Sequence, residues 1–220
     1  MRRVLRAALC GVLALALAAC GEFGLGGHDA GRVPEKPEQL VVRRFVAPEP
    51  AIVLDPSFGF SLRRGSPGVP RAERAAGVGR AAAFALDDGI VRTLRAAGLD
   101  AATSLETNGP PPEDAVVISG EFEKIDQGRR RHVGRIGPGE GESRVIADAR
   151  ITAPGGRILM KIHADSDQIP GEGGMGDTTR VRGVRVTVAD ANRDAARVGR
   201  EIGRQIVDFA RHADWLPPAH

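Results

Sequence analysis

The densest group of residues that could do chemistry is a basic cluster near the middle of the chain, with four arginines within seven residues. A guanidinium presents its N–H donors as a planar fork, which can pair with two oxygens of one phosphate. We therefore predict an anion contact here, for the phosphates of lipid head groups or of lipopolysaccharide. The cluster consists of Arg129, Arg130, Arg131 and Arg135. The alternative interpretation is a solvated turn between two strands, because charge runs often form solvent-exposed surfaces.

A glycine-rich segment, 171–176, reads Gly-Glu-Gly-Gly-Met-Gly and matches the G-x-G-x-x-G pattern of dinucleotide sites. That site needs a strand directly before the glycines and a helix N-terminus directly after them, because the helix amides bind the pyrophosphate. The flanking residues, 168–170 and 177–180, favour neither element. We interpret the segment as a loop and predict no cofactor.

The spacing of acidic residues and histidines gives little support for a metal site. Asp165, Asp167 and Asp177 surround the glycine-rich segment. A calcium loop, however, needs oxygen ligands at alternate positions, and Ile169 occupies one of them. The five histidines show neither i, i+4 spacing nor the H-E-x-x-H pattern of zinc sites. We therefore predict no metal site and interpret the acidic segment as a solvated loop.

No pair of nucleophile and base stands out in the sequence. Ser119 lies in Val-Ile-Ser-Gly, which lacks the first glycine of the G-x-S-x-G nucleophile turn. Asp87 and Asp88 occupy adjacent positions of a predicted helix that point apart, so they are poorly placed to share a proton. We predict a non-enzymatic protein with no catalytic residues. An enzyme remains the third hypothesis, because catalytic groups can assemble in space from distant positions.

The N-terminus has the features of an export signal. Arg2, Arg3 and Arg6 precede an apolar run of 13 residues that ends at Ala19, whereas a membrane-spanning helix needs about 20. The next residue is Cys20, and Leu-Ala-Ala-Cys resembles the lipobox of bacterial lipoproteins, in which the cysteine thiol receives diacylglycerol. We predict a signal peptide over 1–19 and lipidation at Cys20. An ordinary cleaved secretory signal is the alternative.

Lipidation at Cys20 would place the mature protein at a membrane surface. Each buried acyl CH₂ contributes about 0.8 kcal/mol, so the two or three chains of a lipoprotein, palmitate among them, hold it far better than one. By resemblance to the sorting of Gram-negative lipoproteins, Gly21 after the cysteine, in place of Asp, implies the periplasmic face of the outer membrane. The expected partners are the membrane, through Cys20, and an envelope protein; the sequence indicates no oligomeric state.

The charge balance argues against a nucleic-acid partner. The chain has 220 residues, with 31 Lys and Arg against 28 Asp and Glu, a formal net charge of +3. Loss of the three signal-peptide arginines leaves 28 basic residues, equal to the acidic ones. A formally neutral mature protein gives no electrostatic reason to expect nucleic acid. Cys10 would leave with the signal, so the folded part has no disulfide and relies on its core.

Alternating apolar residues predict the strands of a sheet. The predicted strands cover 40–46, 51–54, 116–123, 144–152 and 158–164. The last two form a hairpin, because the residues between them, Ala153-Pro154-Gly155-Gly156, are a turn sequence. Ile146 and Leu159 fall on the outward positions of this hairpin. Their placement favours a covering loop or a partner surface over that face.

Two long helices are predicted where apolar residues recur at spacings of three and four, over 71–97 and from 188 to 209. Gly98 is placed to end the first. The order of elements indicates an α+β fold, an antiparallel or mixed β-sheet with two long helices packed on one face. We assign this single domain to 40–217, behind a lipidated N-terminus and a flexible Gly- and Pro-rich tether at 20–39.

The segment 120–145 resembles the signature of a family of bacterial lipoproteins that contain the domain of unknown function 4410. Its members have a strand ending near Gly, a basic turn, an Ile-Gly-aromatic-Gly-x-Gly segment and a strand of alternating small and apolar residues. Here 136–141 reads Ile-Gly-Pro-Gly-Glu-Gly, with Pro138 in place of the aromatic. The end of the last helix, Trp215-Leu216-Pro217, is also similar to the family. The resemblance implies an envelope lipoprotein and supplies no activity, cofactor or catalytic residue.

We therefore expect a non-enzymatic accessory or protein-interaction module of an envelope assembly. The alternative is a binding module for lipid, lipopolysaccharide or peptidoglycan, such as an auxiliary lipoprotein of an envelope transporter.

Overall fold

A computed structural model describes most of the chain from residue 35 onward and leaves several predicted sites outside its described part. The described residues are 35–55, 69–107, 109–128, 142–169, 179–181, 184–186 and 190–217. They belong to one compact unit, Glu35–His220. The predicted signal peptide over 1–19, Cys20, the arginine cluster 129–135 and the glycines of 171–176 lie outside the described residues.

Two long helices form where the apolar periodicity predicts them. Helix α2 covers Arg71–Ala96, and its buried side chains fall at spacings of three and four along one stripe. The chain leaves this helix at Gly98, whose φ of 86° suits glycine better than other residues. Helix α3 covers Ala191–His212, and the carboxylate of Asp190 caps it by accepting the Asn192 amide at 3.0 Å.

The strands form a six-stranded mixed sheet in the order β3-β1-β4-β5-β6, with β2 beside β4. Strand β1 runs parallel to both β3 and β4, whereas β4, β5 and β6 are antiparallel. The bounds are β1 Leu40–Val42, β2 Ile52–Val53, β3 Ala101–Thr103, β4 Val116–Asp126, β5 Arg144–Thr152 and β6 Ile158–Asp165. Two short strands, β7 Thr179–Val181 and β8 Val184–Val186, form a separate hairpin.

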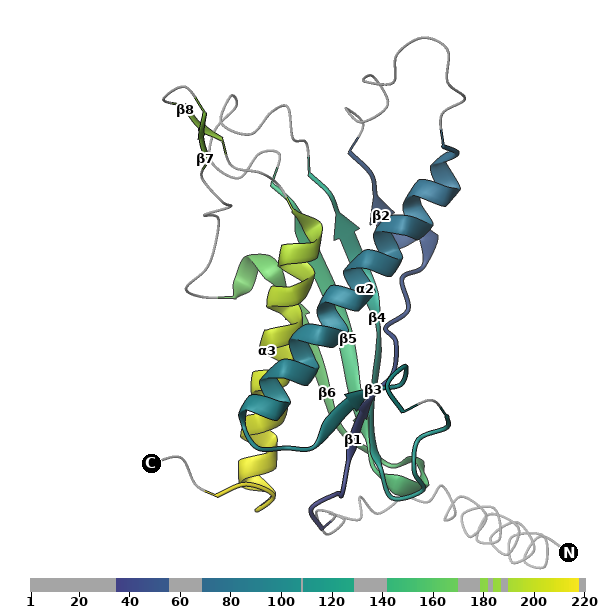
Figure 1. The fold of residues 1–220 in the computed structure, drawn as a ribbon, viewed down its shortest axis with the longest axis vertical. Helices are drawn as coiled ribbons and strands as arrows, with labels where there is room; N and C mark the ends of the chain where they lie inside the picture. Colours follow the sequence, from purple (N-terminus) through teal and green to yellow (C-terminus); the bar gives the residue numbers. More distant parts are fainter. Residues whose placement is uncertain are drawn as a thin grey trace, which may run out of the picture. The chain divides into compact units, whose positions relative to one another are not determined.

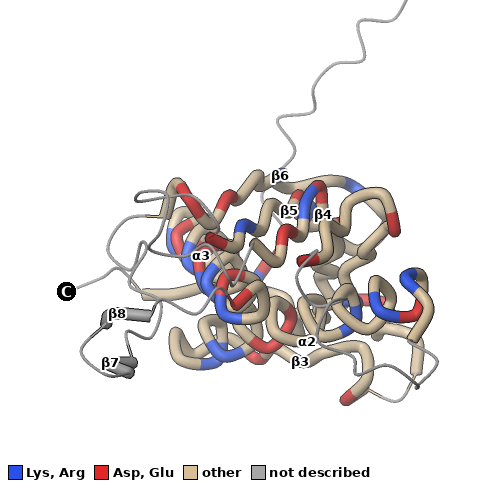
Figure 2. Tube along the Cα trace, turned by 90° about the horizontal axis from the view of Figure 1, so that it is seen from above, with Lys and Arg blue, Asp and Glu red and all other residues tan. Residues whose placement is uncertain are grey.

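Both helices lie side by side on one face of the sheet (Figure 1). Viewed from above, β4, β5 and β6 lie on one side of the helices, which confirms the predicted α+β architecture (Figure 2). Between the layers lies one apolar core, in which the Phe45 and Phe122 rings meet edge to face with centroids 6.3 Å apart. Among the described residues, no helix is long and apolar enough to cross a membrane.

Several element boundaries differ from the sequence-based prediction. The hairpin of β5 and β6 is confirmed, and β4 runs three residues beyond the predicted 123. Strand β3 was not predicted, because three residues are too few to show alternation. The predicted strand 40–46 ends at Val42, and only Val46 rejoins the sheet through an isolated bridge to Glu121.

Candidate functional site

The face of the sheet turned away from the helices is polar, and its charges lie in rows across the strands. The β4–β5 and β5–β6 registers align Ser119, Arg150 and Lys161 in one row. The next row contains Glu121, Asp148 and His163. Figure 2 shows acidic and basic positions interleaved along these three strands. This face therefore offers local charge of both signs.

We call the row of Ser119, Arg150 and Lys161 the basic row, and the row of Glu121, Asp148 and His163 the acidic row. A cavity of about 560 Å³ opens at Ser119 and Arg150 of the basic row. Its walls come from the segment after β1, the loop after β3, and the exposed faces of β4 and β5. Its charged and hydroxyl-bearing lining residues are Arg43, Arg44, Ser104, Ser119, Glu121 and Arg150. We call this cavity the basic pocket. Its volume falls within the range of small-molecule sites, roughly 300–1,000 Å³.

A bulge after β1 places two consecutive arginines at the pocket. Val42 lies opposite Ile118 and Val46 opposite Glu121, so the segment after β1 contains one residue more than β4 over the same stretch. The extra residue breaks strict alternation, so Arg43 and Arg44 are both exposed while Phe45 fills the core with 2% exposure. The bulge therefore presents two adjacent guanidiniums that a regular strand would point to opposite faces.

Gly120 of β4 makes room for this bulge. A Cβ at this position would collide with the Phe45 ring and with the carbonyl oxygen of Asp148. The missing side chain lets Phe45 lie directly over β4, where its ring also meets Phe122. The pocket thus depends on a glycine that itself offers no functional group.

A buried carboxylate on helix α2 fastens the bulge from the core side. Asp87 Oδ1 accepts the Phe45 amide at 3.4 Å, and Oδ2 lies 3.3 Å from Arg44 Nε. Burial raises the pKa of Asp87 to about 7, although the Phe45 amide and the Arg44 charge both act to lower it. The neighbouring Asp88 pairs with Arg92 at the surface, so the two acids point apart as predicted.

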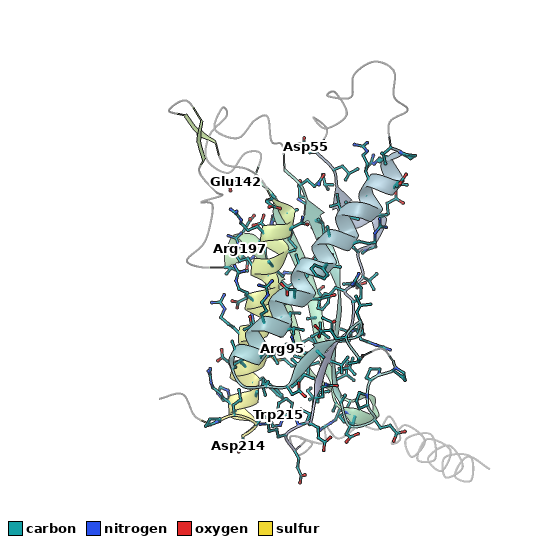
Figure 3. The ribbon with its side chains drawn as sticks, in the orientation of Figure 1. Asp55, Arg95, Glu142, Arg197, Asp214 and Trp215 are labelled. Atoms are coloured by element: carbon teal, nitrogen blue, oxygen red, sulfur yellow. The ribbon has the colours of Figure 1, made fainter. Side chains whose placement is uncertain are left out.

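The opposite wall is held by the residues that follow β3. Ser104 donates its amide to Val42 O at 2.8 Å, which ties the start of the loop to β1. Arg95, which is labelled on helix α2 in Figure 3, donates to Ala101 O at 2.7 Å and pairs with Glu106 at 2.9 Å. Pro110 and Pro111 complete this wall. Both walls are therefore anchored to the helix layer.

The pocket contains more positive than negative charge. Three arginines line it against one carboxylate, that of Glu121. Arg44 is paired with Asp87, whereas Arg43 and Arg150 have no carboxylate within 4.0 Å in the described part of the chain. Two guanidiniums thus remain available to an anion.

A second cluster combines Asp148 and His163, from the row that also contains Glu121, with Glu123 two residues further along β4. His163 Nδ1 lies 2.8 Å from Asp148 Oδ1 and 4.0 Å from Glu123 Oε2. The hydrogen bond to Asp148 raises the pKa of His163, and the nearby acidic charges act in the same direction. Nitrogen and oxygen donors of this kind can bind divalent cations. All three side chains are more than half exposed, and they form a surface ion-pair network here.

The part of the chain that contains this sheet matches a known protein family. The family model described as Domain of unknown function (DUF4410) matches residues 41–181. The chain belongs to the DUF4410 family. No curated protein matches it.

Solved structures similar to this DUF4410 chain are distant. A PelC dodecamer from Paraburkholderia phytofirmans has 13% identity and a TM-score of 0.36, over 76% of this chain and 86% of that one. A crystal structure of an uncharacterized protein has 11% identity and a TM-score of 0.38, over 80% of this chain and 95% of that one.

The DUF4410 structure places the other candidates from the sequence as follows. Asp165 and Asp167, considered for calcium, both pair with the Arg144 guanidinium, which lowers the pKa of Asp165. Asp177 lies outside the described residues. Ser119, considered as a nucleophile, lines the basic pocket beside Arg150.

Sequence reasoning missed the basic pocket and predicted an anion contact elsewhere. Arg129, Arg130, Arg131 and Arg135 lie outside the described residues, so that contact remains a prediction. One signal for the pocket was present in the sequence. Two consecutive arginines interrupt a β-branched strand candidate, which is unfavourable unless the chain bulges there.

Proposed function

We propose that this DUF4410 chain is a lipid-anchored protein of the cell envelope that acts through contacts with an envelope partner and performs no catalysis. The observation that carries the proposal is the segment Leu17-Ala18-Ala19-Cys20 after three arginines and an apolar run. This pattern is typical of a lipoprotein signal, because it combines a basic start, a short apolar core and a cysteine at the cleavage point.

The proposed anchor would position the domain near a membrane through Cys20. Removal of residues 1–19 would leave Cys20 as the acylated N-terminus, with palmitate among its chains, and Gly21 favours the periplasmic face of the outer membrane. A flexible coil of the 19 residues that follow Cys20 spans about 24 Å, at roughly 5–6 Å times the square root of its length. The domain could then reach partners within a few nanometres of the anchor.

The exposed face of β4, β5 and β6 supports a role in contacts. In the described part of the chain, both long helices pack on the other face of the sheet. Transient interfaces have about the same polarity as the rest of a protein surface. A charged, open sheet face is therefore compatible with a reversible partner.

The anchor is tested by metabolic labelling with an alkynyl palmitate and by membrane fractionation. We expect the natural chain to carry the label and to fractionate with membranes. We expect Cys20→Ser to do neither. Cys10→Ser is the matched control, because Cys10 is the other of the chain's two cysteines and lies in the predicted signal peptide. Retained label in Cys20→Ser, or loss of label in Cys10→Ser alone, would contradict the proposal.

The contact role is tested by photo-crosslinking on intact cells. A crosslinker at Lys161, on the open sheet face, should yield an adduct with a defined envelope protein. The same crosslinker at Arg80, exposed on helix α2, is the control and should not yield that adduct. Monomer alone at Lys161 would count against this surface.

The second candidate function is a binding module for an envelope component such as lipid, lipopolysaccharide or peptidoglycan. The basic pocket favours it, because two guanidiniums there have no carboxylate partner among the described residues. The two functions are compatible, since an anchored protein can both bind a ligand and contact a partner.

A further inference from the structure

We propose that the basic pocket binds the phosphate group of a phosphate ester, with the organic part of the ligand lying against the remaining pocket wall. This inference deepens the binding-module candidate and rests on it. It does not require Cys20 to be acylated, so the labelling experiment and the binding experiment can fail independently.

The residues that can donate to a ligand in the pocket come from three separate segments. Arg43 comes from the bulge after β1, Ser104 from the loop after β3, and Arg150 from β5. Such an arrangement suits a tetrahedral group, whose oxygens point in different directions, better than a planar carboxylate. Guanidinium–phosphate hydrogen bonds are charge-assisted and can be bidentate, which makes them among the strongest that proteins form.

Arg43 and Arg150 have no ion pair among the described residues to satisfy their charges. Elsewhere on the sheet, Arg144 is fixed between two aspartates. Arg150 instead lies opposite Lys161 in the β5–β6 register. Like charges directly opposite each other on a sheet are destabilising. An anion at Arg150 would remove this repulsion, whereas the unliganded sheet retains it.

The size and walls of the pocket indicate an ester rather than inorganic phosphate alone. The cavity of about 560 Å³ has room for more than a phosphate group. The lining also includes Val46, Pro110 and Pro111, whose apolar surfaces can pack against a glycerol or sugar moiety. Glu121 at the same pocket disfavours a second anionic group there.

The binding experiment uses isothermal titration calorimetry on the full chain purified from membranes in detergent. The probes are inorganic phosphate, glycerol 3-phosphate, dihexanoyl phosphatidylglycerol and succinate. We expect glycerol 3-phosphate or the phospholipid to bind, and succinate to bind at least about tenfold more weakly, because it lacks the tetrahedral oxyanion. Preference between the two esters distinguishes a soluble phosphate ester from a lipid head group. Equal affinity for succinate would overturn the assignment to phosphate.

Four single variants locate the site. Arg43→Gln and Arg150→Gln should each weaken binding about tenfold or more, the usual effect of losing a charged hydrogen-bond partner. Glu121→Gln should tighten binding, because it removes the acidic charge at the pocket. Arg80→Gln is the matched control, since it removes one exposed positive charge from helix α2, outside the pocket lining, and should change affinity less than about twofold.

Thermal unfolding checks that the variants remain folded, which is expected because Arg43 and Arg150 are exposed. Unchanged affinity in folded Arg43→Gln and Arg150→Gln would overturn the proposal. So would an equal loss in Arg80→Gln, because binding would then follow overall surface charge and not the pocket.

Discussion

At the scale of single residues, Asp87 connects the helix layer to the bulge that forms the basic pocket. Its side chain is 5% exposed and accepts the Phe45 amide while it pairs with Arg44. A buried carboxylate is stable when charged only if its partners offset the loss of hydration. Here the pKa of about 7 means that the Phe45 amide and Arg44 offset only part of the loss of hydration.

Asp87 should make the stability of the fold depend on pH. Its pKa rises from 3.8 to about 7, so the folded state binds more protons than the unfolded state between these values. The free energy of unfolding should therefore fall as the pH rises from about 4 to about 7, by about 4 kcal/mol at most, at 1.36 kcal/mol for each pKa unit. Urea unfolding at pH 4 and pH 8 measures most of this fall.

Substitution separates Asp87 from the other titrating groups. Asp87→Asn should reduce the fall of the unfolding free energy with pH, because the neutral amide does not titrate. Asp194, whose pKa burial also raises, should still contribute a slope of the same sign. Asp88→Asn is the control, since Asp88 is adjacent but pairs with Arg92 at the surface. An Asp87→Asn variant with the slope of the natural chain would show that another group is responsible.

At the scale of elements, the helix layer is held together by glycines that allow close approach of α2 and α3. A Cβ at Gly89 would lie 2.7 Å from the carbonyl oxygen of Ala196, and one at Gly199 would collide with the backbone of Leu86. Backbone atoms cannot rotate away as a side chain can, so an added methyl group must push the helices apart.

Gly199→Ala should therefore destabilise the fold by about 1–3 kcal/mol, the usual cost of overpacking, even though alanine is the better helix former. Gly77→Ala, in helix α2, is the matched control. A Cβ at Gly77 meets nothing within 4 Å, so this change should stabilise the fold by roughly 0.5–1 kcal/mol. Urea unfolding of both variants gives the comparison, and equal stability of the two would contradict close helix packing.

Elements with a local sequence pattern were predictable, whereas those that depend on contacts between distant residues were not. Helices α2 and α3 and the hairpin of β5 and β6 were predictable, because their periodicity is local. The end of β1 was not, since it depends on Phe45 packing over Gly120, which is 75 residues away along the chain. The pocket was missed for the same reason, as its lining comes from four separate segments.

At the scale of the whole molecule, the distribution of charge matters more than its sum. Loss of the three signal arginines would leave equal numbers of basic and acidic residues. On the sheet face, a basic row that includes Arg150 lies beside an acidic row that includes Asp148. The fields of neighbouring rows of opposite sign oppose each other at a distance, and salt screens what remains beyond about 10 Å, the Debye length at 0.1 M. The molecule can therefore bind an anionic group locally without attracting polyanions generally.

This cancellation predicts that the protein binds a small phosphate ester but not duplex DNA. DNA binding draws on contacts to many successive phosphates, and each contact adds to affinity through counterion release. The basic pocket offers the guanidiniums of Arg43 and Arg150 to a single phosphate group, and Glu121, Asp148 and Glu123 lie on the same sheet face, where a duplex would have to pass. An electrophoretic mobility assay with labelled duplex DNA at low salt should show no complex at protein concentrations that bind glycerol 3-phosphate. The ester titration on the same sample is the control for active protein. A salt-sensitive DNA complex that survives Arg43→Gln and Arg150→Gln would reveal a basic surface outside the pocket and contradict charge cancellation.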